Sequence, residues 1–110
     1  MSWENKEGYS TRVLASGRNL EGKDYEIQLV CFRKGKHSHF HKRKTEFFFF
    51  MSGKGKAVID KKEEKIGKDS FFTIKPNQLH AIINESEDSS LNAIMVKIDN
   101  DKNDTFVPSH

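Results

Sequence analysis

The sequence lacks the features of a membrane protein, an exported protein or a disulfide-stabilised domain. Its one cysteine, Cys31, cannot form an internal disulfide, which is typical of a chain that folds in a reducing compartment. No apolar run approaches the roughly 20 residues of a membrane span. The first ten residues, MSWENKEGYS, do not show the basic, apolar and small-residue pattern of a secretory signal. We therefore expect a cytoplasmic protein without a membrane partner.

Long helical periodicity is also missing. Short runs rich in Phe, Ile, Val and Tyr recur roughly every eight to twelve positions between turn residues, which is typical of an all-β protein. No domain boundary is visible, so we expect one domain over residues 1–110, with an N-terminal strand, a core over about 25–98 and a C-terminal tail over 99–110. The expected strands cover residues 9–14, 25–32, 37–41, 45–51, 56–59, 64–66, 70–74, 79–84 and 91–98.

The charge balance is only mildly positive. The chain has 19 Lys and Arg against 16 Asp and Glu, a net charge of +3. Its basic segments RKGK, KRK and KGK lie where turns and loop tips are expected, and solvated turns explain them without nucleic acid. Nucleic acid is therefore not among the expected partners.

The segment HSHFH holds three histidines at alternate positions, His37, His39 and His41. On a strand such residues share one face, about 6.5 to 7 Å apart, so two neighbouring imidazoles can contact one ion. Glu46 follows five residues after His41. On an unbroken strand this odd spacing would place Glu46 on the opposite face. Glu46 therefore lies on the face of the histidines only if the intervening KRKT contains a turn or bulge.

The run of four phenylalanines after Glu46 predicts an alternation of its own. With Glu46 facing inward, Phe48 and Phe50 also face the interior, as core residues and as a wall for a bound ligand. Phe47 and Phe49 then face outward, where another part of the protein has to shield their rings from water. A second subunit or the N-terminal strand of the same chain could supply it.

A second candidate segment is KPNQLHAIIN, residues 75–84. A turn at Pro76 and Asn77 leads into a strand in which His80 and Asn84 share one parity. Three histidines and one carboxylate, without a thiolate, suit one divalent transition metal: iron, manganese, nickel, copper or zinc. Such a set leaves coordination positions open for a small-molecule ligand.

Together the two segments resemble the cupin family. Two histidines, a glutamate and a glycine have the spacing of the first cupin motif, and a turn, a histidine and an asparagine have that of the second: His39, His41, Glu46 and Gly53, then Pro76, Asn77, His80 and Asn84. The resemblance covers about residues 25–98. It implies a double-stranded β-helix, a jelly-roll barrel whose metal ligands are His39, His41, Glu46 and His80.

Three positions depart from the family pattern. Arg33 replaces the glycine that is usual six residues before the first motif histidine, Asn77 stands where glycine is common, and His37 adds a third histidine. Asparagine at position 77 is tolerable because it adopts the left-handed conformation. His37 leaves two interpretations open: it pairs with His39 as a ligand, or it lies at the rim and contacts substrate, where it is the one spare candidate base.

Within the family the chain is most similar to small cupins related to mannose-6-phosphate isomerase. That likeness implies a metal-dependent isomerase or epimerase for a small polar molecule, a carbohydrate or sugar phosphate, with substrate contacts from His37, Phe48, Phe50 and Asn84. Two alternatives stay open: an iron-dependent dioxygenase with the same ligands, and a non-catalytic module that binds or senses a metal or small molecule. The resemblance also implies a homodimer.

Overall fold

The structure is a computed structural model that describes the backbone of residues 2–6, 8–41, 44–86, 90–99 and 105–106, and the side chains of residues 2–6, 8–35, 44–86 and 90–99. All regular elements in these residues are strands: β1 (Glu4–Asn5), β2 (Tyr9–Arg18), β3 (Asp24–Phe32), β4 (Gly35–His41), β5 (Thr45–Ser52), β6 (Lys54–Ile59), β7 (Lys62–Gly67), β8 (Phe71–Ile74), β9 (His80–Asn84), β10 (Leu91–Ile98) and β11 (Thr105–Phe106). The described part of the chain contains no helix suited to crossing a membrane.

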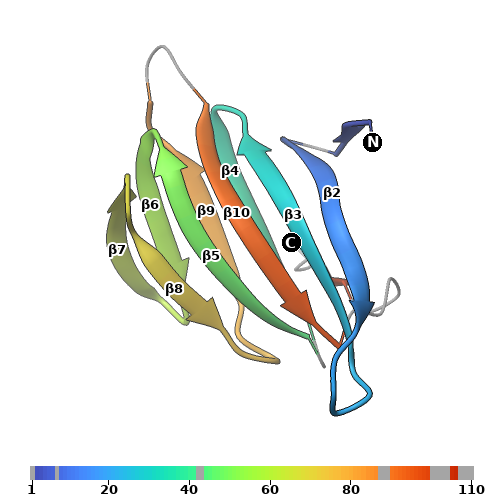
Figure 1. Cartoon of the computed structure of the whole chain (residues 1–110). Helices are drawn as coiled ribbons and strands as arrows, with labels where there is room; N and C mark the ends of the chain where they lie inside the picture. The colour runs from blue at the N-terminus through green and yellow to red at the C-terminus, as the bar shows by residue number, and fades with distance from the viewer. Residues whose placement is uncertain (1, 7, 42–43, 87–89, 100–104, 107–110) are drawn as a thin grey trace.

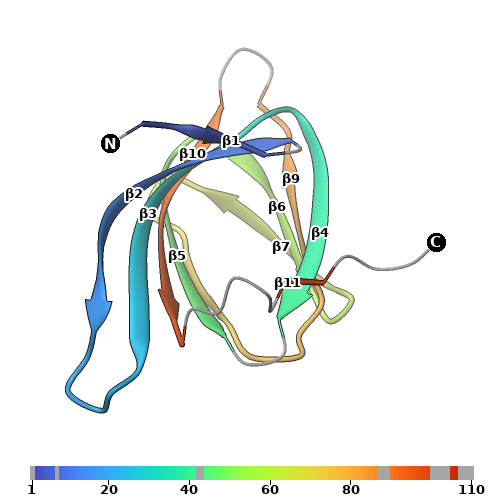
Figure 2. The same ribbon diagram turned by 90° about the vertical axis from the view of Figure 1, so that its right-hand side faces the viewer.

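The strands form two antiparallel sheets. One has the order β1-β2-β3-β10-β5-β8 and the other β11-β4-β9-β6-β7. The sheets enclose a common interior, with β3, β10 and β5 on one side and β4, β9 and β6 on the other (Figure 1, Figure 2). This arrangement confirms the predicted all-β jelly-roll barrel.

Several tight turns contain residues with positive φ. Asp60 and Lys61, at the tip between β6 and β7, both have positive φ, 48° and 71°, as a two-residue type I′ hairpin turn requires. Asn77 has a φ of 66°, so the left-handed conformation expected at this position is confirmed. Gly53, between β5 and β6, has a φ of 98°, which L side chains rarely adopt.

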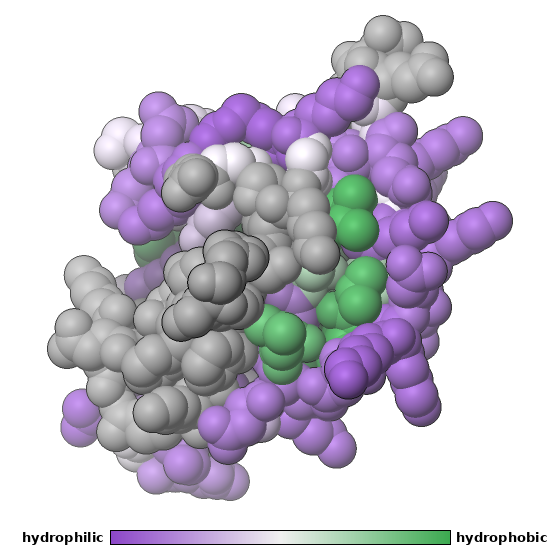
Figure 3. Space-filling view, turned by 180° about the vertical axis from the view of Figure 1, so that it is seen from behind, coloured by the Kyte–Doolittle hydropathy of each residue, from purple (hydrophilic) through white to green (hydrophobic). Residues whose placement is uncertain are grey.

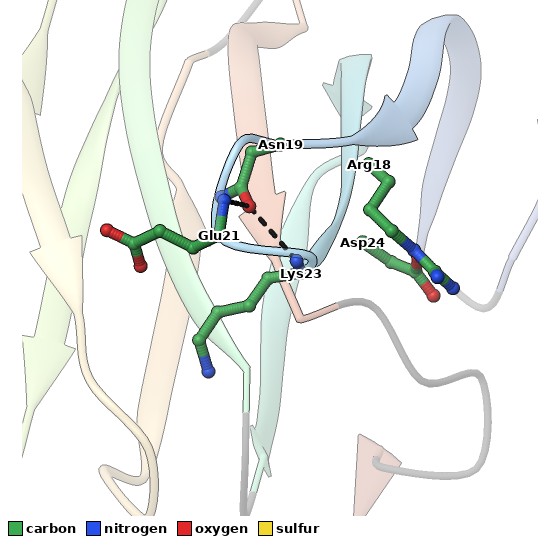
Figure 4. Close-up of polar contacts among 5 residues, drawn as sticks. All are labelled: Arg18, Asn19, Glu21, Lys23 and Asp24. Carbon is green, nitrogen blue, oxygen red and sulfur yellow. Dashed lines mark hydrogen bonds and ion pairs between the residues drawn. The ribbon is translucent and has the colours of Figure 1, made fainter.

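The N-terminal strand is longer than the predicted range of 9–14, because β2 continues to Arg18 and pairs with β3 as far as Asp24. Polar contacts at the hairpin tip explain the extension (Figure 4). The Oδ1 atom of Asn19 accepts hydrogen bonds from the backbone N–H groups of Glu21 and Lys23, each at 3.0 Å. Beside them, Arg18 Nε donates to Asp24 Oδ1 at 3.1 Å. The side chains close this turn, so the strand pairs up to it.

The core confirms the alternation predicted along β5. Phe48 and Phe50 are 1% and 0% exposed, whereas Phe49 is 40% exposed. The ring of Phe48 lies 5.2 Å from that of Phe72 on the neighbouring β8 and 6.4 Å from that of Phe32 on β3, between ring centroids. These aromatic contacts join three strands of the six-stranded sheet below the candidate site.

The close approach of β6 and β9 allows only glycine at position 55. A Cβ atom there would overlap the carbonyl oxygen of Ile83 and lie 3.0 Å from Leu91 Cδ2. We expect Gly55→Ala to lower the free energy of unfolding by about 1–3 kcal/mol, as overpacking does. Gly67→Ala is the matched control, because its added Cβ would meet nothing closer than Gly53 O at 3.4 Å. Urea unfolding that shows equal stability for the two variants would contradict this packing.

Candidate metal centre

His80 is held in place by the turn that precedes β9. The backbone N–H of Lys75 donates to Gln78 Oε1 at 2.8 Å, and Gln78 Nε2 donates to Asp60 Oδ2 at 2.9 Å. The backbone N–H of Asp60 in turn donates to the carbonyl of Leu79 at 3.1 Å. These bonds tie the turn to the β6–β7 hairpin, so the strand begins at a defined position with His80 as its first residue.

Glu46 approaches the same point from the opposite sheet. It is the second residue of β5, where its Cα pairs with Lys97 of β10 on one side and Ile74 of β8 on the other. Its Oε1 atom lies 3.6 Å from His80 Nε2, and each side chain is only 1% exposed. The structure therefore brings these two residues together inside the barrel.

The Glu46–His80 pair is suited to a shared metal ion. Ligating nitrogen and oxygen atoms lie about 2.0–2.2 Å from a transition metal such as zinc, so two ligands of one ion are at most about 4.4 Å apart. The observed 3.6 Å lies within that limit. The ring of Phe48 packs against the imidazole of His80 at 6.3 Å between centroids, which gives the pair an apolar floor.

The three histidines of β4 are described only by their backbone. In the β4–β9 pairing the Cα of His39 lies directly opposite that of His80, and the Cα of His37 opposite that of Ile82. The Cα of His41 pairs with Thr105 of β11. The side chains of His37, His39 and His41 lie outside the described residues, as does the predicted turn or bulge at positions 42–43.

The described side chains alone do not make a complete metal site. Among them, no group of three or more His, Cys, Asp or Glu residues is arranged to hold a metal ion. Glu46 and His80 are two of the four predicted ligands, and their oxygen and nitrogen atoms are of the types that the metals named from the sequence accept. The assignment of His39 and His41 as ligands stays a prediction.

The predicted substrate contacts lie at different depths of the barrel. Phe48 is the inward neighbour of Glu46 on β5, and Phe50 follows one step further from the pair. Asn84 lies at the far end of β9 from His80, where it joins the two sheets: its Nδ2 donates to the carbonyl of Phe32 at 2.8 Å. The binding roles of these three residues stay predictions.

Sequence reasoning missed a set of polar residues on the inner face of the six-stranded sheet. In the paired strands, Glu26 of β3 lies opposite Lys97 of β10, which lies opposite Glu46. Gln28 follows Glu26 at the same parity and is 5% exposed. A signal was present for two of them, because Glu26 and Gln28 alternate with apolar residues in the segment DYEIQLVCF.

Tyr9 adds a phenol to the same interior. Its ring lies 6.0 Å from that of Phe32 between centroids. Burial raises the pKa of the phenol above its ordinary 10.0, Lys6 lowers it, and the negative charges of Glu46 and Glu4 raise it. The electrostatic influence of Glu46 therefore reaches the N-terminal strand.

Arg33, the departure from the usual glycine, anchors the N-terminal segment. Its Nη1 donates to Ser10 Oγ at 2.7 Å, and its Nη2 donates to the carbonyls of Tyr9, at 3.3 Å, and Lys6. The backbone N–H of Arg33 donates to the carbonyl of Gly8 at 2.9 Å. The arginine therefore holds Tyr9 over the barrel interior, a role that its position in the motif could not indicate.

Comparison with known families decides the classification. The model of the cupin domain matches residues 28–97, which include all four predicted ligands. The chain belongs to the cupin family. No curated protein matches this cupin in sequence.

Solved structures similar to this cupin share its fold at low sequence identity. KdgF from Halomonas sp. is 13% identical, with 94% of this chain and 90% of that chain covered and a TM-score of 0.76. Streptomyces PAC13 with uridine is 16% identical, with 97% and 84% covered and a TM-score of 0.78. A protein assigned as a sugar phosphate isomerase from Acidithiobacillus ferrooxidans is 20% identical, with 67% and 49% covered and a TM-score of 0.60. At these identities the likeness shows the fold alone.

The buried pair predicts how metal binding responds to mutation. We expect Glu46→Ala and His80→Ala to fold but to lose most bound metal, because each removes a ligand that comes from a different sheet. The loss in affinity should exceed the roughly 10- to 100-fold that removal of an outer-shell partner causes. Elemental analysis and titration with Zn²⁺ measure it.

Glu63→Ala is the control for this experiment, because it removes an exposed carboxylate from β7. It should keep the metal content of the parent protein. Full metal occupancy in both Glu46→Ala and His80→Ala would contradict the assignment of the centre.

Proposed function

We propose that this cupin binds one divalent transition metal and acts as an isomerase or epimerase on a small polar molecule, a carbohydrate or sugar phosphate. The observation that carries the proposal is the buried Glu46–His80 pair, whose facing atoms are 3.6 Å apart. Glutamate and histidine are seldom fully buried without a function or a partner, and here they come from opposite sheets. His39 and His41 complete the proposed ligand set.

The proposed chemistry divides between the metal and the chain. A bound divalent metal would polarise a substrate carbonyl and stabilise the negative charge that forms on its oxygen. Isomerisation also needs a group that takes a proton from one carbon and returns it to the next. We assign that role to His37. Phe48 and Phe50, both buried, would keep water from the reacting carbons.

The structural neighbours support a sugar-containing substrate class. One is assigned as a sugar phosphate isomerase, and another carries uridine and is described as a nucleoside dehydratase. Lys44, which is 2% exposed and lies two residues before Glu46, places a cation near the proposed site. A substrate with a phosphate group would be compatible with that charge.

The test is an assay of the metal-loaded protein with aldose and ketose pairs. Mannose 6-phosphate, glucose 6-phosphate and their unphosphorylated sugars are incubated with the Zn²⁺ and Mn²⁺ forms, and interconversion is followed by proton NMR in D₂O. We expect turnover with exchange of one carbon-bound proton for deuterium, and a loss of more than about 100-fold in Glu46→Ala, because removing a ligand costs more than the 10- to 100-fold of an outer-shell partner.

Other outcomes separate the rival functions. Oxygen uptake by the Fe²⁺ form, measured with an oxygen electrode, without sugar interconversion would replace the isomerase with a dioxygenase. Metal and sugar binding with no turnover under either condition would indicate a binding or sensing module.

We also propose that the protein is a cytoplasmic homodimer that pairs through the outer face of the six-stranded sheet. Across this face the paired strands align Leu29, Ile94, Phe49 and Phe71 in one row. Phe49 and Phe71 are 40% and 61% exposed. On the opposite side of the molecule, the described residues are mostly hydrophilic around an apolar area (Figure 3). An exposed aromatic row that lies on one sheet suits a symmetric partner. A free Cys31 is compatible with a reducing compartment.

Replacement of the exposed aromatic residues tests the dimer. We expect Phe49→Lys and Phe71→Lys to convert a dimer to a monomer in light scattering after size exclusion, because each puts a charge in the middle of the contact. Leu20→Lys, at a fully exposed position outside the row, is the matched control and should stay dimeric. A monomeric parent protein would refute the proposal.

A further inference from the structure

The inner face of β3 presents two polar residues among apolar ones. Glu26, Gln28, Val30 and Phe32 share the inward parity of this strand, and Gln28 is 5% exposed. A glutamine at such a depth is usually satisfied by hydrogen bonds within the protein. Within the described residues, only part of the Gln28 amide has a hydrogen-bond partner.

The two ends of the Gln28 amide differ in their contacts. Its Nε2 donates to Glu26 Oε1, which sets the orientation of the amide. Its Oε1 is buried and accepts no hydrogen bond from the described residues. A buried acceptor without a donor is unfavourable, so an oxygen held in this way is suited to a donor that arrives with a ligand.

Asn84 shows what a purely structural buried amide looks like in this protein. It is 4% exposed, close to the value for Gln28. Its Nδ2 donates to the carbonyl of Phe32 and its Oδ1 accepts from the backbone N–H of Ser86, both at 2.8 Å. Among the side chains that the structure describes, both ends of the Asn84 amide are hydrogen-bonded, but only the donor end of the Gln28 amide is.

The strand register places Gln28 on the sheet that carries Glu46, two strands away from β5 and level with Phe48. Gln28 lies opposite Met95 of β10, and Met95 lies opposite Phe48 of β5, whose ring contacts His80. Two strand spacings of about 4.8 Å separate the backbones of Gln28 and Phe48. The alternation of β3 and β5 points both side chains to the inner face of the sheet, where Gln28 is 5% and Phe48 1% exposed.

We propose that Gln28 is a substrate-binding residue whose Oε1 accepts a hydrogen bond from a hydroxyl group of the molecule bound at the metal centre. This inference rests on the proposed function and defines its substrate further. The part of the ligand that faces β3 carries a hydrogen-bond donor, a sugar hydroxyl, because a phosphate or carboxylate oxygen would meet Gln28 Oε1 as one acceptor against another. Any phosphate group lies away from this wall.

The experiment is a titration of the Zn²⁺-loaded protein with mannose 6-phosphate, glucose 6-phosphate and mannose, followed by NMR of the side-chain amides. We expect the Gln28 amide signals to shift with the bound fraction. The amide signals of Asn92, whose Nδ2 donates to Ser52 Oγ on the outer face, should stay in place as the internal control.

A variant measures the contribution of the hydrogen bond. Gln28→Met keeps the length of the side chain and removes the acceptor, and we expect it to weaken sugar binding about three- to ten-fold without changing Zn²⁺ binding. Gln28→Asn shortens the side chain by one methylene and should also lower the affinity for the sugar. It replaces Gln28→Met in this experiment if the methionine variant does not fold.

The outcomes separate this inference from the function on which it rests. Sugar binding with unmoved Gln28 signals, or with unchanged affinity in the folded variant, would overturn the role of Gln28 and leave the proposed function standing. A parent protein that binds Zn²⁺ but none of the three sugars would overturn both.

Discussion

A carboxylate and an imidazole, each almost fully buried and 3.6 Å apart, are the constraint on which the interior of this cupin depends. Replacing a buried charged pair by apolar residues of equal volume often raises stability, by about 1–4 kcal/mol. A buried pair of this kind is therefore weak evidence for stability and points instead to a function. The rest of the fold holds these two side chains, from two different sheets, at one place.

Several contacts hold Glu46 and His80 in position. Hydrogen bonds among Lys75, Gln78 and Asp60 fix the turn before His80. The aromatic residues inside β5, β8 and β3 support the strand that carries Glu46. At the other end of β9, Asn84 ties the two sheets together through the carbonyl of Phe32. The end of β9 at Asn84 is thus fixed by a hydrogen bond between the sheets. The buried polar pair Glu46 and His80 lies at the other end of β9.

Much of this arrangement could be predicted from the sequence, because an alternating strand has only two faces. Once Glu46 was placed inward, the burial of Phe48 and Phe50 and the exposure of Phe49 followed. The alternation pattern could not predict strand ends that depend on side-chain hydrogen bonds in a turn or on pairing with a distant strand. The extension of β2 depends on Asn19 and its neighbours at the hairpin tip, and the two-residue strands β1 and β11 exist only through pairing with β2 and β4.

The candidate site was predictable in part for the same reason. The spacing of Glu46 and His80 pointed to one metal centre, and the structure brings these two together. Gln28 and Lys97 face the interior through their parity, yet their types carry no motif, and Arg33 acts through contacts 23 to 27 residues away in the chain. Such roles become visible only when the strands are paired in space.

Anomalous scattering from a crystal grown with Zn²⁺ tests the central claim most directly, because it locates the ion without reference to any activity. The account predicts one strong peak inside the barrel, about 2.0–2.2 Å from Glu46 Oε1 and from His80 Nε2. A Zn²⁺ ion found only elsewhere on the chain would contradict this claim. So would an interior without a peak when Zn²⁺ is present in the crystal.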